Sequence, residues 1–401
     1  MVQELTRKGR LTLVAVGSLV GLAILVAAVA TLYLGVNAKA RVTAAATEAL
    51  GMEVSVGGRS AMGIFPALHF TFEDVHVRNG GVDVASAGEV DLGIAVLPLL
   101  HHEVRLEKIV LKRLRIAIKI DRAGKWNVDS SSQGQQDAAA LAIAKISASD
   151  ATFGYADEST GRRLEASACN LNVDRLRLPG GARADFHKNL SFAAKLDCGH
   201  FRIADLAATD LALTFDAKSG TVAVEPVVMR LLGGLGSGSI HADYSGAVPV
   251  YVLHGRLTRF RVEEFFKALS PKNAGTGFMD FSTNLTLRGP LTGALAQASN
   301  GDASLHGKDL TLEMGDLDKK FSRYESSQNF NLVDVGAFFF AGPAGLAVTK
   351  GYDFARIFQG TDGSTTVRTL ISEWQVVHGV AHAQDVAMAT PHNRLALKGS
   401  L

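Results

Sequence analysis

The side chains that most often carry out catalysis are scattered along this sequence and form no recognisable motif. No serine lies in a G-x-S-x-G segment, and neither H-E-x-x-H nor C-x-x-C occurs. His378 and His382 are four residues apart, but their segment alternates like a strand. In a strand two such residues lie about 13 Å apart, too far to chelate one metal ion. The sequence therefore predicts no enzyme activity, no metal site and no cofactor.

Other groups that resemble sites have simpler structural explanations. Asp121, Asp157 and Asp243 fall at turn positions, where the carboxylate caps its own backbone. The glycine cluster Leu231–Ser239 (LLGGLGSGS) fits neither G-x-G-x-x-G nor the P-loop spacing, and it opens no helix. It predicts a sharply bent or bulged strand rather than a phosphate-binding loop.

The chain has two cysteines, Cys169 and Cys198, each in a strand-like segment. In an exported protein they could form one disulfide; alternatively, they are two buried thiols that pack as small hydrophobic side chains. Both interpretations remain open, because the sequence does not show whether the two strands are neighbours.

The charge balance argues against nucleic acid as a partner. The sequence has 41 basic and 39 acidic residues, a formal net charge of +2. Proteins that bind nucleic acid present basic patches with interleaved aromatic residues, which this sequence lacks.

One uncharged segment near the N-terminus has the length of a membrane span. Leu11–Val36 contains 26 residues without a charge or a proline, and as a helix it would reach about 39 Å. Arg7, Lys8 and Arg10 precede it, which favours a cytoplasmic N-terminus and an exported body. The alternative is a cleaved signal peptide ending near residues 38–40, but its apolar region would be unusually long.

Beyond Gly51 the apolar residues repeat with a period of two, which is typical of strands with one apolar and one solvated face. Charged pairs interrupt the alternation at Glu73-Asp74, Glu107-Lys108 and Lys112-Arg113, and each pair predicts a bulge or turn. A hairpin is expected around Ser219-Gly220. The body is therefore predicted to be mainly β, an antiparallel sheet with a few short helices.

Two further segments depart from the strand pattern. Val262–Leu269 (VEEFFKAL) predicts a short helix. Val335–Val348 is strongly apolar but too short, and too rich in glycine and proline, to span a membrane. It is either a core element or a segment lying in a membrane interface or an apolar channel.

So many one-sided strands require something to cover their apolar face. A second sheet would close a sandwich, whereas a curled sheet would leave a groove for an apolar ligand such as lipid acyl chains. The parity of the alternation predicts the residues that would line such a groove: Leu68, Phe70, Phe72, Val90, Leu92, Ile94, Ile116, Ile118, Phe153, Tyr155, Leu213 and Phe215.

In this order the segments resemble the AsmA family of bacterial envelope proteins over essentially the whole chain. The matching landmarks are the anchor helix, Leu50-Gly51 with Glu53-Val54, residues 63–66 (GIFP), Asp74-Val75, residues 98–100 (PLL), Glu103-Val104, Ile109-Val110, the turn Asp121…Gly124…Asn127, residues 153–157 (FGYAD) with Thr160-Gly161, residues 231–238 before Asp243, and the C-terminal segments 326–331 (SSQNFN) to 385–388 (DVAM).

The resemblance implies an elongated, half-open β-groove related to bridge-like lipid-transfer proteins. It also implies an inner-membrane anchor with the bulk of the chain in the periplasm, phospholipids and other envelope proteins as partners, and a role in outer-membrane biogenesis. We expect the strand pattern that stops at Leu401 to continue in longer relatives. The expected organisation is a cytoplasmic N-terminus (1–10), a transmembrane helix (11–36), an AsmA-like N-terminal β unit (37–130), a middle β unit (141–260) and an AsmA-like C-terminal region (261–401).

A different class of function also fits the sequence. In that alternative the β-body fills its own interior and serves as a structural or accessory subunit of an envelope membrane complex, without transporting lipid.

Overall fold

A computed structural model defines most of the β-body. It describes residues 43–44, 47, 52–63, 68–95, 106–128, 141–158, 161–178, 186–203, 206–269, 274–289, 299–313, 364–392 and 394–397. Within these ranges no helix is both long and apolar enough to cross a membrane. The predicted anchor Leu11–Val36 and the apolar segment Val335–Val348 lie outside the described residues.

The chain forms two compact units. The first comprises the described residues of Met1–Ala204 and Thr209–Val224, and the second those of Asp205–Ala208 and Glu225–Leu401. The predicted boundary near residues 130–141 falls inside the first unit, because β7, which follows it, pairs with β5 and β6, which precede it.

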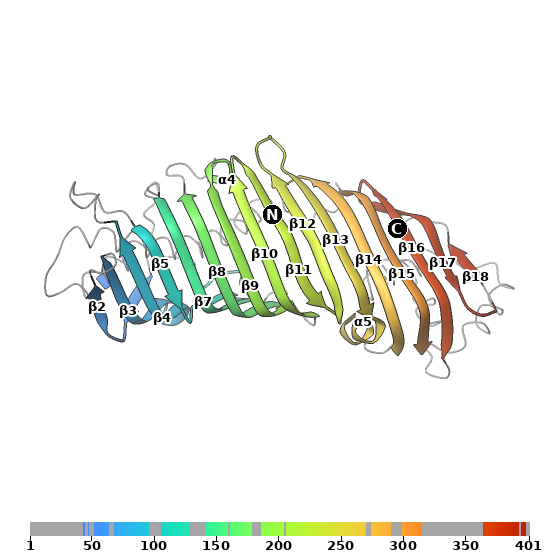
Figure 1. Cartoon of the computed structure of the whole chain (residues 1–401), viewed down its shortest axis with the longest axis horizontal. Coiled ribbons are helices and arrows are strands. Elements are labelled where there is room, and N and C mark those ends of the chain that lie inside the picture. Colours follow the sequence, from blue (N-terminus) through green and yellow to red (C-terminus); the bar gives the residue numbers. More distant parts are fainter. Residues whose placement is uncertain are drawn as a thin grey trace. The chain divides into compact units, whose positions relative to one another are not determined.

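The body is mainly β, as predicted (Figure 1). Its strands are β1 (Glu53–Val56), β2 (Ser60–Gly63), β3 (His69–Asn79), β4 (Val82–Ile94), β5 (Leu106–Lys112), β6 (Arg115–Ile120), β7 (Leu141–Asp157), β8 (Arg162–Leu178), β9 (Ser191–Ile203), β10 (Leu206–Lys218), β11 (Thr221–Leu231), β12 (Gly234–Asp243), β13 (Val250–Arg261), β14 (Ala274–Arg288), β15 (Ser299–Glu313), β16 (Thr365–Val377), β17 (Val380–Ala389) and β18 (Arg394–Leu397). The helices with defined bounds are α4 (Phe186–Asn189) and α5 (Val262–Leu269).

In the first unit most neighbouring strands are antiparallel, but the prediction of a purely antiparallel sheet is wrong. β5 and β6 together lie between β4, to which they are antiparallel, and β7, to which both are parallel. The physical reason is the connection from Ile120 to Leu141, whose 20 residues are enough to return the chain to the opposite end of the strand. The sheet is therefore mixed.

A row of kinks crosses the first unit from strand to strand. Asp74 in β3, Arg113 between β5 and β6, Asp150 in β7 and Ala168 in β8 all have left-handed backbone conformations, with φ of 56°, 51°, 52° and 51°. The strand registers place them side by side across the sheet. The kinks therefore lie along one line across the strands of the first unit.

Each kink also preserves the apolar face. In β3 the buried side chains change from even to odd positions between Phe72 and Val75, on either side of Asp74. Around Arg113 the buried positions change from odd to even, from Leu111 at the end of β5 to Leu114 just before β6. The predicted changes of apolar parity at Glu73-Asp74 and Lys112-Arg113 are thus confirmed, but they are left-handed kinks that leave the register with β4 unchanged, not bulges. The bulge predicted at Glu107-Lys108 is confirmed, because the β4–β5 register shifts there.

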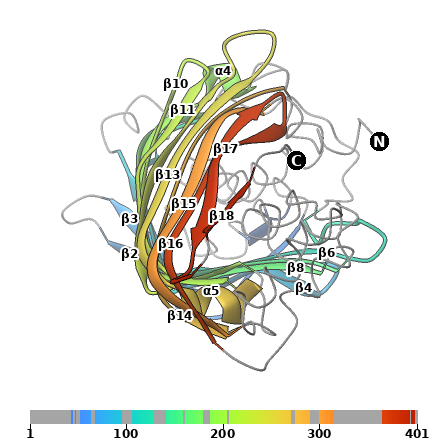
Figure 2. The ribbon, with the colours of Figure 1, turned by 90° about the vertical axis from the view of Figure 1, so that its right-hand side faces the viewer.

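In the second unit β12 to β18 follow one another as antiparallel neighbours. Figure 2 shows the curvature of β13 to β17 within this unit. Helix α5 has the predicted bounds and lies against β14 (Figure 1), with Phe266 in the buried core. The predicted hairpin turn at Ser219-Gly220 is confirmed between β10 and β11, and the glycine cluster forms a turn at Leu232-Gly233 followed by β12.

Candidate functional site

The main feature that could bind a ligand in the first unit is a continuous apolar face, here called the first-unit apolar face. One row of cross-strand pairs runs Phe70–Leu92–Ile109–Ile146–Val173–Ala194 across β3, β4, β5, β7, β8 and β9. A second row on the same face, beyond the row of kinks, runs Ile116–Phe153–Ala166–Phe201. Directly paired residues project to the same side of a sheet, so these rows form one surface.

The predicted groove residues divide into two groups by burial. Phe72 is 4% exposed, Val90 and Leu92 are 1% exposed, and Ile94 is fully buried. The remaining eight are half-buried: Leu68, Phe70, Ile116, Ile118, Phe153, Tyr155, Leu213 and Phe215. The four buried ones lie on β3 and β4, whereas all the predicted residues on β6, β7 and β10 are half-buried.

The structure brings most of the predicted residues together in pairs. Phe70 faces Leu92 and Phe72 faces Val90 across β3 and β4. Ile116 faces Phe153 and Ile118 faces Tyr155 across β6 and β7. Leu68 lies just before β3, where its carbonyl accepts a hydrogen bond from the Ile94 amide at 2.9 Å. Leu213 and Phe215 lie two residues apart on β10.

Sequence reasoning missed several half-buried members of the same face, namely Leu164, Leu171, Val173 and Leu196. They pair in register with predicted residues or with their neighbours, as Leu164 does with Tyr155. Their own alternation on β8 and β9 carried the signal. It was disguised by the kinks at Ala168 and Arg175, where the apolar parity changes.

Near the C-terminal end of β7 the apolar face ends in an aromatic pair. The rings of Trp126 and Tyr155 are 6.2 Å apart between centroids and tilted by 49°. The turn before Trp126 is held by Asp121, whose carboxylate accepts the amide hydrogens of Ala123 and Lys125 at 2.9 Å each. This confirms the turn that the sequence predicts there, and it places an indole over the end of β7.

Charged residues follow immediately at the same end of these strands. Asp157 and Arg162 are the last and first residues of β7 and β8, and they face each other directly. Both act on Tyr155. Burial raises the pKa of the Tyr155 hydroxyl, and the Asp157 carboxylate raises it further, whereas the Arg162 guanidinium lowers it. Arg162 is exposed, and Asp157 is buried.

Cys169 and Cys198 are joined by a disulfide. They are directly paired residues of β8 and β9, and their exposed fractions are 0% and 3%. The bridge lies on the first-unit apolar face, next to Ala151.

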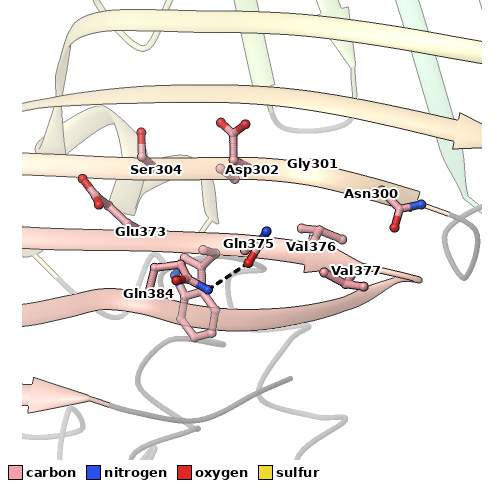
Figure 3. A pocket seen from close by; sticks show the side chains of 11 residues that line it. Asn300, Gly301, Asp302, Ser304, Glu373, Gln375, Val376, Val377 and Gln384 are labelled. Carbon is pink, nitrogen blue, oxygen red and sulfur yellow. Dashed lines mark hydrogen bonds between the residues drawn. The ribbon is translucent and has the colours of Figure 1, made fainter.

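The second unit contains a pocket of a different character (Figure 3). It has a volume of about 720 Å³ and is bordered by polar side chains of β15 to β17, including Asp302, Glu373 and Gln375. Gln384 donates to the side-chain oxygen of Gln375 at 3.2 Å, the dashed contact in Figure 3. None of the twelve predicted groove residues borders this pocket.

Metal-ligating side chains are not clustered in the described ranges, where no three His, Cys, Asp or Glu residues are placed to share an ion. His378 lies in the β16–β17 turn, and His382 lies on β17. In the first unit the arrangement offers an apolar ligand a continuous apolar face.

Comparison with known proteins supports one assignment. Residues 6–180 match the AsmA family, a range that contains the predicted anchor and the strands up to β8. The landmarks at residues 231–243 and 326–388 lie beyond this match. No curated protein and no solved structure matches the chain significantly. Residues 6–180 of the chain therefore belong to the AsmA family.

Proposed function

We propose that this protein binds phospholipid acyl chains on the first-unit apolar face and takes part in outer-membrane biogenesis by holding or transferring lipid. The proposal depends on one observation. The face continues across six neighbouring strand positions, yet Ile116, Ile118, Phe153 and Tyr155 stay only half-buried on it. A packed core would bury such residues fully, as it buries Leu111 and Leu114.

The energetics need no catalytic residue. Removing an acyl chain from water gains ~0.8 kcal/mol for each buried CH₂, so a strip of aliphatic and aromatic side chains is enough to retain a lipid. In this role the protein is not an enzyme and needs no cofactor.

The location we propose is the inner membrane, with Leu11–Val36 as a single span and the bulk of the chain in the periplasm. The disulfide between Cys169 and Cys198 supports an exported body, because disulfides persist in oxidising compartments and are rare in the cytosol. The match of residues 6–180 to the AsmA family supports an envelope role.

Substitution of adjacent residues on β7 tests the lipid-binding face. Phe153 projects onto the apolar face, whereas Thr152 is exposed on the opposite side of the same strand. The full chain would be purified in mild detergent, and its bound phospholipid would be measured by native mass spectrometry and by extraction. We expect the wild type and Thr152→Glu to retain phospholipid and Phe153→Glu to lose most of it, with all three proteins still inserted in membranes. Absence of lipid from the wild-type protein, or equal loss in both variants, would refute the proposal.

A second candidate function rests on the fully buried part of the face. Val90, Leu92 and Ile94 are at most 1% exposed, as in a filled interior. This favours a structural or accessory subunit of an envelope complex. Crosslinking in cells that captured one stoichiometric protein partner, together with lipid-free purified protein, would support this second function.

A further inference from the structure

The edge where the apolar face ends in Trp126 and Tyr155 combines three features that occur together where proteins meet lipid headgroups. They are a half-buried aromatic pair, an exposed cation and a continuous apolar strip leading away from both. Tyr and Trp rings favour the boundary between apolar and wet surroundings, because each has an apolar body and a polar tip.

Arg162 is the cation that shares the face with this aromatic pair. In β8 the pairs Leu164–Tyr155 and Arg162–Asp157 are two residues apart, so Arg162 projects to the same side as Leu164 and Tyr155. Arg163 pairs with Ala156 and projects to the opposite side. Alternation therefore separates two neighbouring arginines onto the two faces of the sheet.

The pairing state of Arg162 differs from that of several other cations of the first unit. Arg59, Arg78 and Lys112 each form an ion pair, with Glu73, Asp83 and Glu89 at 3.3, 2.8 and 2.6 Å. Arg162 makes no ion pair with any residue that the structure describes, and its side chain is exposed. Among the described acidic residues, Asp157 pairs with Arg162, Glu158 follows Asp157, and Asp121 lies in the turn before Trp126. The Asp121 carboxylate caps its turn, and Asp157 is buried.

We propose that Arg162 binds the phosphate group of a diacyl phospholipid whose chains lie along Ile118, Phe153 and Leu164, with Trp126 and Tyr155 at the boundary between headgroup and chains. This assignment rests on the proposed function, because the headgroup belongs to the same lipid whose acyl chains the apolar face is proposed to bind. Guanidinium groups suit phosphate oxygens, since their N–H donors form paired, charge-assisted hydrogen bonds.

A comparison of two lipids that differ only in the phosphate separates the headgroup from the chains. The probes are phosphatidylglycerol and the diacylglycerol with identical acyl chains, each added to the full chain in detergent. We expect Arg162→Gln to weaken retention of phosphatidylglycerol about tenfold, since charge-assisted contacts contribute on this scale, and to leave diacylglycerol retention unchanged. Arg162→Lys should restore part of the difference, and the matched control Arg163→Gln should behave as the wild type.

Fluorescence gives an independent readout of the position of the headgroup. The fluorescence of Trp126 is the part of the emission that the wild type has and Trp126→Phe lacks. A phospholipid that carries a nitroxide on its headgroup should quench this Trp126 fluorescence. Loss of this quenching in Arg162→Gln, with diacylglycerol binding intact, would support the site.

The two proposals fail in different ways. If wild type binds neither lipid, the proposed function is wrong, and the headgroup site is wrong with it. If wild type binds both lipids equally and Arg162→Gln changes neither, the apolar face binds chains, but the assignment of Arg162 is overturned. Equal losses of both lipids in Arg162→Gln would also overturn it, because they would indicate a structural role.

Discussion

Cys169 and Cys198 lie directly opposite each other on β8 and β9, and their disulfide is buried on the apolar face of the first unit. The bridge closes a loop with a sequence separation of 29 residues, between strands that hydrogen bonds already pair. It therefore ties together β8 and β9, the last two strands of the row that forms the apolar face.

Removing the disulfide should destabilise the first unit. For a loop of this length the chain-entropy model gives a loss of about 3–4 kcal/mol. We expect the double variant Cys169→Ala/Cys198→Ala to melt at a lower temperature than the oxidised wild type.

Because both sulfurs are buried, we also expect a mild reductant to reduce the disulfide only after partial unfolding of the first unit. Equal melting temperatures for wild type and double variant would contradict the first expectation, and rapid reduction of the folded protein would contradict the second.

Gly301 in β15 should tolerate no side chain. Its φ is +147°, and a Cβ there would collide with the backbone carbonyl oxygen of Asn284 on β14. Backbone strain and the collision together should cost about 2–4 kcal/mol in Gly301→Ala. The matched control is Gly246→Ala, where the nearest atom to an added Cβ is the Val248 carbonyl oxygen at 3.8 Å.

The measurement for this pair is thermal melting of the full chain, combined with limited proteolysis to locate the weakened unit. Gly301→Ala should expose cleavage sites in the second unit, and Gly246→Ala should match the wild type. Indistinguishable melting curves for the two variants would show that β14 can move away from β15 at little cost.

The surface cluster around Asp83 should make a small, pH-dependent contribution to stability. The Arg78 guanidinium donates to Asp83 at 2.8 Å, and His76 lies 3.2 Å away. The hydrogen bond from Arg78, followed by that from His76, holds the pKa of Asp83 below its usual 3.8. A carboxyl group whose pKa is lower in the folded state stabilises the fold above its unfolded pKa, and this stabilisation is lost as pH falls through the folded pKa.

Accordingly, Asp83→Asn should melt slightly below the wild type at pH 7, and the difference should shrink as pH falls below about 3.8. The exposed Asp216→Asn serves as the control and should show no such trend. Because the cluster is largely exposed, salt should also reduce the difference. A gap between Asp83→Asn and wild type that widened towards acid would have the wrong sign and would refute the assignment.

The local features of this fold were predictable, because neighbouring residues alone decide them. Alternation with a period of two identified the strands, and the charged pairs at Glu73-Asp74 and Lys112-Arg113 marked the kinks, where the apolar parity must change for one face to stay apolar. The helix Val262–Leu269 followed in the same way from its amphipathic pattern and the proline shortly after it.

The long-range features were decided only by the tertiary structure. The parallel pairing of β6 with β7 depends on a connection whose course no local pattern encodes. The disulfide required Cys169 and Cys198 to lie in register on adjacent strands. The burial that separates Leu92 from Ile118 depends on position within the unit, since both residues alternate identically in the sequence. Alternation determined that one face is apolar, and the three-dimensional arrangement determined where that face remains accessible and that Arg162 lies at its edge.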